Sequence, residues 1–365
     1  MKRAITGLLP VLLVLSCTHP EKQDRKPGYF PGPLSANYFT DLFMGECYGY
    51  TGGDGTYSVP LPDGRTIWLF GDTFIGGVNE DNTRQKQVPI YIRNSVVVQD
   101  GDSLRTLYKT KNGRNASFAI IPGQDVPETE RWLWPGDGLI EEGKLKIFFS
   151  AFTQQDTGMW GFRWEALWIG TYSLPELNEE TLLKLYDRTL SQVHFGHAVW
   201  EDGAYTYIYG AGNARPHAAR YPEGDVTAPW EYYDGTGWTT DISKAQPMDE
   251  LRVSEQFSVF KLKDTYILLT QTGGLGPDIC SYTAPAPTGL WMNRQLLYTT
   301  PLPDTVHNLF TYNALAHPQF IKDNQLLVSY NTNSTILEDH FRDAAIYRPR
   351  FFLVPLEKID HSLIH

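Results

Sequence analysis

Residues 52–77 read GGDGTYSVPLPDGRTIWLFGDTFIGG, which is the pattern of a β-hairpin. Two apolar runs, YSVPL and TIWLF, flank a Pro-Asp-Gly turn at positions 62–64. An Asp-Gly pair between two such runs is the strongest short-range signal of a hairpin. An aspartate stands at each open end, Asp54 and Asp72, and each has a glycine beside it. Because carboxylates are depleted in strands, the two aspartates belong either to turns or to a functional rim.

The same design returns four times along the chain. It reads DGLIEEGKLKIFFSAF from position 137, HAVWEDGAYTYIYGAG from 197, EQFSVFKLKDTYILLTQT from 255 and HPQFIKDNQLLVSYNT from 317. The leading residues of the five copies are separated by 83, 60, 58 and 62 residues, which leaves room for two further strands per copy. Four strands in about sixty residues form a propeller blade. The sequence therefore predicts an all-β, five-bladed β-propeller; a β-sandwich with insertions explains the regular spacing poorly.

The N-terminus has the features of a targeting segment. A basic start precedes a short apolar run at 8–15, which is well below the ~18 residues that a membrane span requires. The run ends in Val-Leu-Ser-Cys17, which resembles the lipobox of bacterial lipoproteins. The resemblance implies a signal peptide over 1–17, acylation of Cys17 and a place in the bacterial cell envelope. The alternative is a cleaved secretory signal with an incidental cysteine. A polar, Pro-rich tether is expected over 18–39, followed by one propeller domain over 40–365.

Composition agrees with this organisation. Aromatic residues make up 13% of the chain, and 32 glycines and 24 prolines are spread through it, as in β-rich globular proteins. The net charge of −11 argues against nucleic acid as a partner and fits a neutral ligand such as a glycan. Two cysteines remain in the expected domain, Cys47 and Cys280, and they could form a disulfide or be separate buried thiols.

Propeller geometry predicts where the polar residues of the repeats lie. The innermost strand of each blade lines the central channel and the next strand runs antiparallel to it, so Asp54 and Asp72 should meet at one end of the axis. The leading residues of the five repeats are polar and should surround the channel mouth: Asp54, Asp137, His197, Glu255 and His317. Core packing alone would not select them, because charged groups are rarely buried without a partner.

This layout resembles the arabinanase, β-xylosidase and invertase-type glycoside hydrolases. In those families, acids from different blades converge at the channel mouth, and the matching positions here are Asp54, Asp137 and Glu255. His317 is similar to the axial histidine of the arabinanase group, which helps to hold a central water or metal ion. The Asn-Asp-Pro motif of the invertases is absent from this sequence.

A second resemblance is more specific. The tract GGDGTYSVPLPDGRTIWLFGDTF, followed by Ile92-Arg93-Asn94-Ser95, is similar to a group of secreted bacterial five-bladed propellers of long-unknown function that carry a W-L-F-G-D-T motif. Some relatives of that group are endo-acting D-arabinanases. The resemblance implies glycan hydrolysis with an arabinan-like substrate favoured, although it does not fix the sugar.

Glycoside hydrolysis requires two carboxyl groups, one protonated and one ionised. We expect Asp54 to be the base or nucleophile, with Asp72 as a rival for that role. Glu255 is expected to be the general acid, and Asp137 a modulator or an anchor for sugar hydroxyls. The alternatives are turn chemistry for Asp54 and Asp137, hydrogen bonds from backbone amides beyond the strand end for Asp72, and a salt bridge with Arg252 or another cation for Glu255.

Further residues could bind substrate through stacking or hydrogen bonds at the rim: Trp134, His197, His317, Arg93 and Asn94. No cofactor is predicted, and a structural Ca²⁺ at the axis is a weaker alternative because no dedicated calcium loop is visible. We expect a monomer that binds a polysaccharide or oligosaccharide and contacts the membrane only through its lipid anchor. The main rival to a hydrolase is a non-catalytic glycan-binding lipoprotein.

Overall fold

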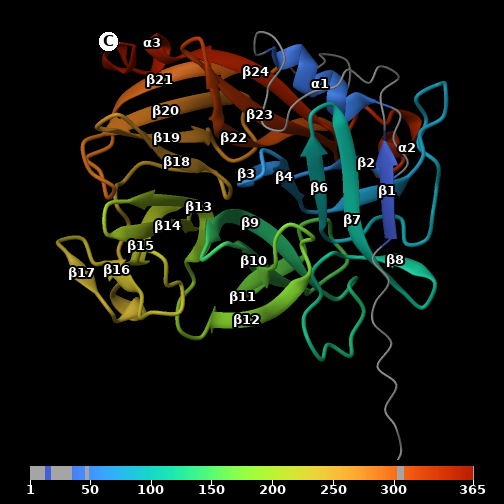
Figure 1. Cartoon of the computed structure of the whole chain (residues 1–365), viewed down its shortest axis with the longest axis horizontal. Helices are drawn as coiled ribbons and strands as arrows, with labels where there is room; N and C mark the ends of the chain where they lie inside the picture. The colour runs from blue at the N-terminus through green and yellow to red at the C-terminus, as the bar shows by residue number, and fades with distance from the viewer. Residues whose placement is uncertain (1–12, 18–34, 46–48, 302–307, 365) are drawn as a thin grey trace, which may run out of the picture.

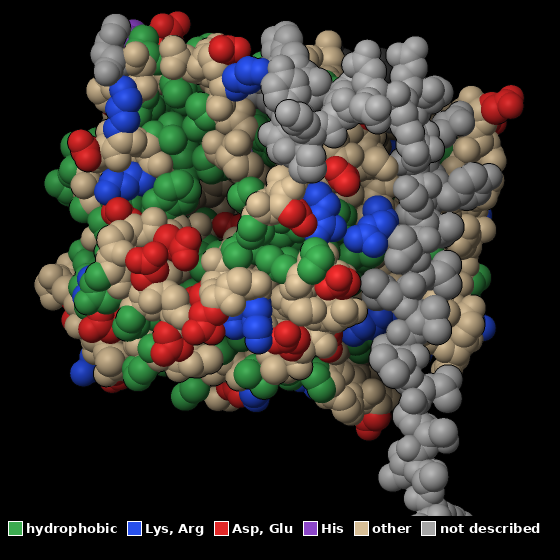
Figure 2. Space-filling view, in the orientation of Figure 1, with side chains coloured by type: hydrophobic (Ala, Val, Ile, Leu, Met, Phe, Trp, Pro, Cys, Tyr) green, Lys and Arg blue, Asp and Glu red, His purple; other side chains and the backbone are tan. Residues whose placement is uncertain are grey.

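The computed structural model describes residues 13–17, 35–45, 49–301 and 308–364. Five antiparallel sheets are arranged around a central axis, which confirms the predicted five-bladed β-propeller (Figure 1). Among the described residues, no helix has the length and apolar character needed to cross a membrane. Acidic side chains are scattered over the face shown in Figure 2, in keeping with the net charge of −11.

Blade I contains the hairpin and is the first sheet of the ring. From the axis outward its strands are β3 (Tyr57–Pro60), β4 (Thr66–Phe70), β6 (Ser95–Asp100), β7 (Ser103–Lys111) and β1 (Leu13–Cys17), and β8 (Arg114–Ala116) also pairs with β7. Strand β4 is buried at all five positions because neighbouring blades cover both of its faces.

The other four blades follow in chain order. Blade II consists of β9 (Arg131–Glu141), β10 (Lys144–Gln154), β11 (Phe162–Tyr172) and β12 (Glu179–Asp187). Blade III consists of β13 (His194–Asp202), β14 (Tyr205–Gly212), β15 (Arg215–Pro222), β16 (Glu231–Tyr233) and β17 (Trp238–Thr239). Blade IV consists of β18 (Ser258–Leu262), β19 (Thr265–Gln271), β20 (Asp278–Ala284) and β21 (Met292–Thr299). Blade V consists of β22 (Leu309–Lys322), β23 (Gln325–Ser334) and β24 (Pro349–Pro355).

The innermost strands β3, β9, β13, β18 and β22 contact one another in turn and close the ring around the axis. Short helical elements lie in connections and near the C-terminus: α2 (Asp339–Arg342), α3 (Leu356–Ile359) and two 3₁₀ turns (Ile242–Lys244 and His361–Leu363). In blade IV, Cys280 is buried and free of any disulfide with a described residue. Cys47, the other half of the possible pair, lies outside the described residues.

The helix α1 (Ala36–Met44) packs against blades I and V and belongs to the folded domain. Its buried residues Phe39, Leu42 and Phe43 follow the i, i+3, i+4 spacing of one helix face. The Phe39 ring lies 5.9 Å from Trp68 of β4 and 5.4 Å from Phe351 of β24, measured between ring centroids. The helix therefore overlaps the end of the segment 18–39 that was expected to be a tether.

The hairpin has the predicted register. Tyr57 pairs with Leu69, Leu61 donates to the Arg65 carbonyl at 2.8 Å, and Gly64 has the positive φ of 88° that its turn requires. Beyond the hairpin, β2 (Gly49–Gly53) pairs with β5 (Thr73–Gly76). Asp54 lies between β2 and β3, and Asp72 lies between β4 and β5. The two connections run side by side, since the Gly71 amide donates to the Asp54 carbonyl at 2.7 Å.

Candidate active site

A cleft of about 1060 Å³ opens at the end of the axis where Asp54 and Asp72 lie. Glu255 and His197 line the same cleft, so four of the predicted residues of the rim are brought together. A second cavity of about 350 Å³ is lined by residues of all five innermost strands and is therefore the axial channel. His197 lines both cavities, whereas Asp137 lines only the channel.

Asp54 is held in place by neutral groups of blade V. The Tyr312 hydroxyl donates to Asp54 Oδ2 at 2.7 Å, and this hydroxyl accepts a hydrogen bond from Asn333 Nδ2 at 2.9 Å. His340 Nε2 lies 2.8 Å from Asn333 Oδ1 and completes the chain of contacts. Burial first, and then repulsion from Asp72, raises the pKa of Asp54 to about 7, although hydrogen bonds from Tyr312 and Tyr347 lower it.

Close packing of the main chain brings Asp54 to this position. A Cβ atom on Gly71 would lie 2.6 Å from Asp54 Oδ1, well inside contact distance. Glycine at position 71 therefore lets the connection between β4 and β5, which carries Asp72, pass close to the Asp54 carboxylate; a larger residue would displace that carboxylate. The glycine of the predicted motif thus has a direct role in shaping the site.

Asp72 has a cation as its partner. Arg93 Nη1 donates to Asp72 Oδ2 at 3.0 Å, and Trp134 Nε1 donates to Asp72 Oδ1 at 2.8 Å. Arg93 is itself fixed, because its guanidinium lies 3.8 Å from the centre of the Trp132 ring and donates to the Glu128 carbonyl at 3.1 Å. Burial raises the pKa of Asp72, and the charge of Arg93 opposes this rise. When only one of the two carboxyls is ionised, the charge therefore lies on Asp72.

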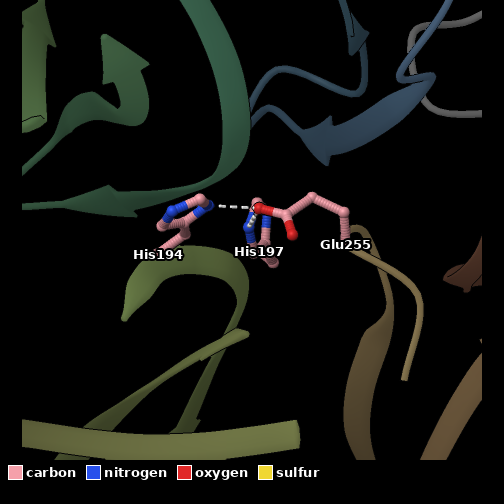
Figure 3. A group of neighbouring side chains, drawn as sticks. All are labelled: His194, His197 and Glu255. Carbon is pink, nitrogen blue, oxygen red and sulfur yellow. Dashed lines mark hydrogen bonds and ion pairs between the residues drawn. The ribbon is translucent and has the colours of Figure 1, made fainter. Parts of the chain in front are cut away.

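Glu255 faces two histidines of β13 across the cleft (Figure 3). His194 Nδ1 contacts Glu255 Oε1, and His197 Nε2 lies 3.4 Å from the same oxygen. Burial raises the pKa of Glu255, but the two histidines outweigh this effect and hold the pKa below its usual range. This favours the ionised carboxylate, which is the opposite of what the predicted general acid requires.

Asp137 bridges the innermost strands of blades II and III. Its Oδ2 accepts from the Val199 amide at 2.9 Å, and its Oδ1 accepts from the Gly138 amide at 2.8 Å. Burial raises its pKa to about 7 against these two hydrogen bonds. Because the side chain faces the channel and not the cleft, the predicted contact of Asp137 with sugar hydroxyls is not supported.

Aromatic side chains form a wall of the cleft. Trp134 packs against Phe152 and Phe162, with ring centroids 4.7 and 5.0 Å away. Trp160 is 56% exposed and reaches from blade II to Phe310 of blade V, with centroids 5.9 Å apart. Flat apolar faces beside carboxylates suit a ligand that has both apolar and hydroxyl-bearing surfaces.

The family described as a domain of unknown function (DUF5005) matches residues 37–355. The chain belongs to the DUF5005 family. No protein of curated function matches it.

Solved structures resemble this DUF5005 chain over most of its length. A suspected hydrolase from Bacteroides ovatus is 23% identical with a TM-score of 0.73, covering 87% of this chain and 89% of that one, and it has the same fold. A GH43_1 enzyme from Xanthomonas citri is 14% identical with a TM-score of 0.45, covering 84% and 88%. A GH43 β-xylosidase/α-arabinofuranosidase from a compost metagenome is 14% identical with a TM-score of 0.44, covering 83% and 94%.

Two of the predicted binding residues have structural roles in this DUF5005 fold. His317 is fully buried between blades V and I, with Nδ1 2.6 Å from Ser58 Oγ and Nε2 2.9 Å from Ser329 Oγ. Burial lowers its pKa to about 3, so it is a neutral packing residue. The structure places the His317 side chain in the interface between the blades, where it lines neither the cleft nor the channel.

Asn94 is the second residue with a structural role. Its Nδ2 donates to the carbonyls of Ala119 and Leu133 at 2.9 and 3.0 Å, and its Oδ1 accepts from the Ala119 amide at 2.7 Å. These bonds use the amide group to hold a connection of blade I against blade II. Asn94 is buried and does not line the cleft.

Sequence reasoning missed the blade V side of the cleft and one histidine. Tyr312, Asn333, His340 and Tyr347 carry no motif that marks them, and they reach Asp54 only through the closure of the ring. His194 was detectable, since it precedes His197 in a His-x-x-His sequence.

Proposed function

We propose that this protein is a glycoside hydrolase that uses Asp54 as general acid and Asp72 as general base. The observation that supports this is the pair of carboxyls in an aromatic-lined cleft with opposed surroundings. Neutral hydroxyls surround Asp54, whereas Asp72 is bound to Arg93. Pairs of carboxyls whose environments separate their protonation states are the basis of glycosidic bond cleavage.

The roles follow from the protonation states. Asp54, with a pKa raised to about 7 by burial and by Asp72, retains a proton that it can donate to the glycosidic oxygen as the bond to the sugar carbon breaks. Asp72 remains ionised beside Arg93 and accepts a proton from the attacking water. The sequence predicted Asp54 as base or nucleophile, with Asp72 as its rival, and Glu255 as general acid. The proposal instead makes Asp54 the acid and gives the role of base to Asp72.

The proposed substrate is a neutral polysaccharide, with an arabinan-like glycan favoured. Trp134 and Trp160 offer faces on which sugar rings can stack, and the acidic composition disfavours anionic polymers. We further propose that the protein is a monomeric lipoprotein of the bacterial cell envelope, anchored through Cys17. These proposals rest on the sequence motifs together with the chemistry of the cleft.

Product release from a panel of arabinans, xylans, fructans and host glycans tests the function. Full-length protein in mild detergent is compared with Asp54→Asn and Asp72→Asn, and with Asp264→Asn in the exposed turn between β18 and β19 as a matched control. We expect oligosaccharides from the wild type and the control, and a loss of about 10²- to 10⁴-fold in both cleft variants. Binding of one glycan without any cleavage would instead indicate a glycan-capture protein.

A further inference from the structure

Three potential metal ligands converge on one side of the cleft. The donor atoms of His194, His197 and Glu255 all lie within 4.8 Å of one another. Figure 3 shows both histidines projecting from β13 toward the carboxylate, which approaches from the segment that precedes β18. The cluster is distinct from the Asp54–Asp72 pair, because it is formed by blades III and IV.

An irregularity in β13 places the two histidines on the same side. Residues three apart in a regular strand point to opposite faces, so His194 and His197 should diverge. In β13, however, Phe195 pairs with Gly210 of β14, and Ala198 pairs with the neighbouring Tyr209. Gly196 and His197 are therefore left without a paired residue in β14. This bulge depends on Gly196, whose φ is +93°. The convergence is therefore built into the strand.

His197 presents an unused nitrogen at this point. The side chain is 7% exposed, and its Nε2 is buried without a hydrogen bond to any described residue. Its other ring nitrogen lies 3.3 Å from the Tyr57 hydroxyl, which orients the ring. Its nearest charged neighbour is Glu255 Oε1 at 3.4 Å, a contact without hydrogen-bond geometry. A cation bound between the two atoms would satisfy this buried nitrogen.

The other two groups are positioned to complete a site. The His194 ring stacks on Trp164 with centroids 4.5 Å apart, which fixes its plane. Glu255 is 54% exposed on its side chain and is free to adjust. Ligand atoms of a tetrahedral zinc ion are about 3.3 Å apart, as follows from metal–ligand distances near 2 Å. The distance of 3.4 Å between His197 Nε2 and Glu255 Oε1 matches this spacing. His194 Nδ1 lies closer to the same oxygen, so the exposed Glu255 side chain would have to move away from it as a metal ion binds.

We infer that His194 Nδ1, His197 Nε2 and the Glu255 carboxylate form a binding site for a divalent transition-metal ion such as Zn²⁺. Two imidazoles and one carboxylate favour such an ion over Ca²⁺ or Mg²⁺, which prefer oxygen ligands. Three protein ligands leave a coordination position open, and all three residues line the cleft. A hydroxyl of a bound ligand, or a water, would occupy that position.

The test is metal binding by tag-free, full-length protein after treatment with a chelator. Zn²⁺ binding is measured by calorimetry, and Co²⁺ is used as a spectroscopic probe of coordination. The wild type is compared with His194→Ala and Glu255→Ala, which alter partly exposed side chains, and with His361→Ala as an exposed histidine outside the cleft. Circular dichroism and thermal unfolding without metal establish that each variant is folded.

We expect one Zn²⁺ per chain, an affinity that is about 100-fold weaker in each cleft variant, and no change in His361→Ala. Bound Co²⁺ should give the intense visible bands of a four- or five-coordinate ion, and Zn²⁺ should raise the melting temperature of the wild type and the control alone. Equal Zn²⁺ affinity in the wild type and both cleft variants would overturn the inference, as would an absence of binding by the wild type. The measurement needs no glycan, so it is independent of the proposed hydrolysis.

Discussion

Replacing Asp54 with asparagine is expected to stabilise the fold at neutral pH, because the folded protein holds this carboxyl in surroundings that oppose its charge. Burial first, and then Asp72, raises its pKa from 3.8 to about 7. Asparagine retains an oxygen that can accept the hydrogen bond from the Tyr312 hydroxyl, now 2.7 Å long, and it introduces no charge. The variant thus removes an electrostatic cost and keeps the main contact.

The sign of the pH dependence follows from counting protons. Between pH 3.8 and about pH 7, folded Asp54 holds a proton that the unfolded chain has already released. The free energy of unfolding therefore falls as the pH rises through this window and is level above it. About three pH units at about 1.4 kcal/mol each give an upper value of about 4 kcal/mol. Because Asp54 shares its proton with Asp72, we expect a difference of about 2 to 4 kcal/mol between wild type and variant at neutral pH.

Urea unfolding of the wild type and Asp54→Asn, from about pH 4 to about pH 8, measures this difference. The two stability curves should lie close together at the acidic end and separate as the pH rises, with the variant more stable. Asp264→Asn, in an exposed turn, should follow the wild type throughout. Parallel curves for the wild type and Asp54→Asn would refute the reasoning, since they would show that the folded state does not raise the pKa of Asp54.

Four further outcomes are expected. Activity should fall above about pH 7 as Asp54 loses its proton. Tyr312→Phe removes a hydrogen bond that lowers the pKa of Asp54, so in a pH–rate profile this fall should occur about one pH unit higher. Arg93→Met should reduce kcat/KM about 100-fold by favouring the protonated form of Asp72. His317→Ala should lower the unfolding free energy by about 3 kcal/mol in urea titrations and leave KM unchanged. In cells grown with radioactive fatty acid, Cys17→Ser should abolish the labelling of this protein.

The sequence predicts the parts of this molecule that depend on local patterns. The Asp-Gly turn and the recurring hairpins specify five blades, and antiparallel pairing in the first hairpin brings Asp54 and Asp72 together. Local patterns do not predict the contacts that form when the last blade closes the ring against the first. Tyr312 and Asp54 are 258 residues apart in the chain, and their hydrogen bond exists only because blade V closes against blade I. The protonation of Asp54 therefore depends on partners that carry no local signal.

The five leading residues differ in their surroundings because the innermost strands do not share one regular register. Strand β3 pairs with β4 without interruption, and Asp54 precedes it at the cleft. The register of β9 shifts beside Asp137, and that of β22 shifts between Tyr312 and Leu315, just before His317. A single extra residue exchanges the two faces of a strand. Equivalent positions in the repeats can therefore point into the cleft, the channel or a blade interface, and neither spacing nor residue type distinguishes these outcomes. In β13 two residues, Gly196 and His197, are left unpaired, and this irregularity brings two histidines together that a regular strand would separate.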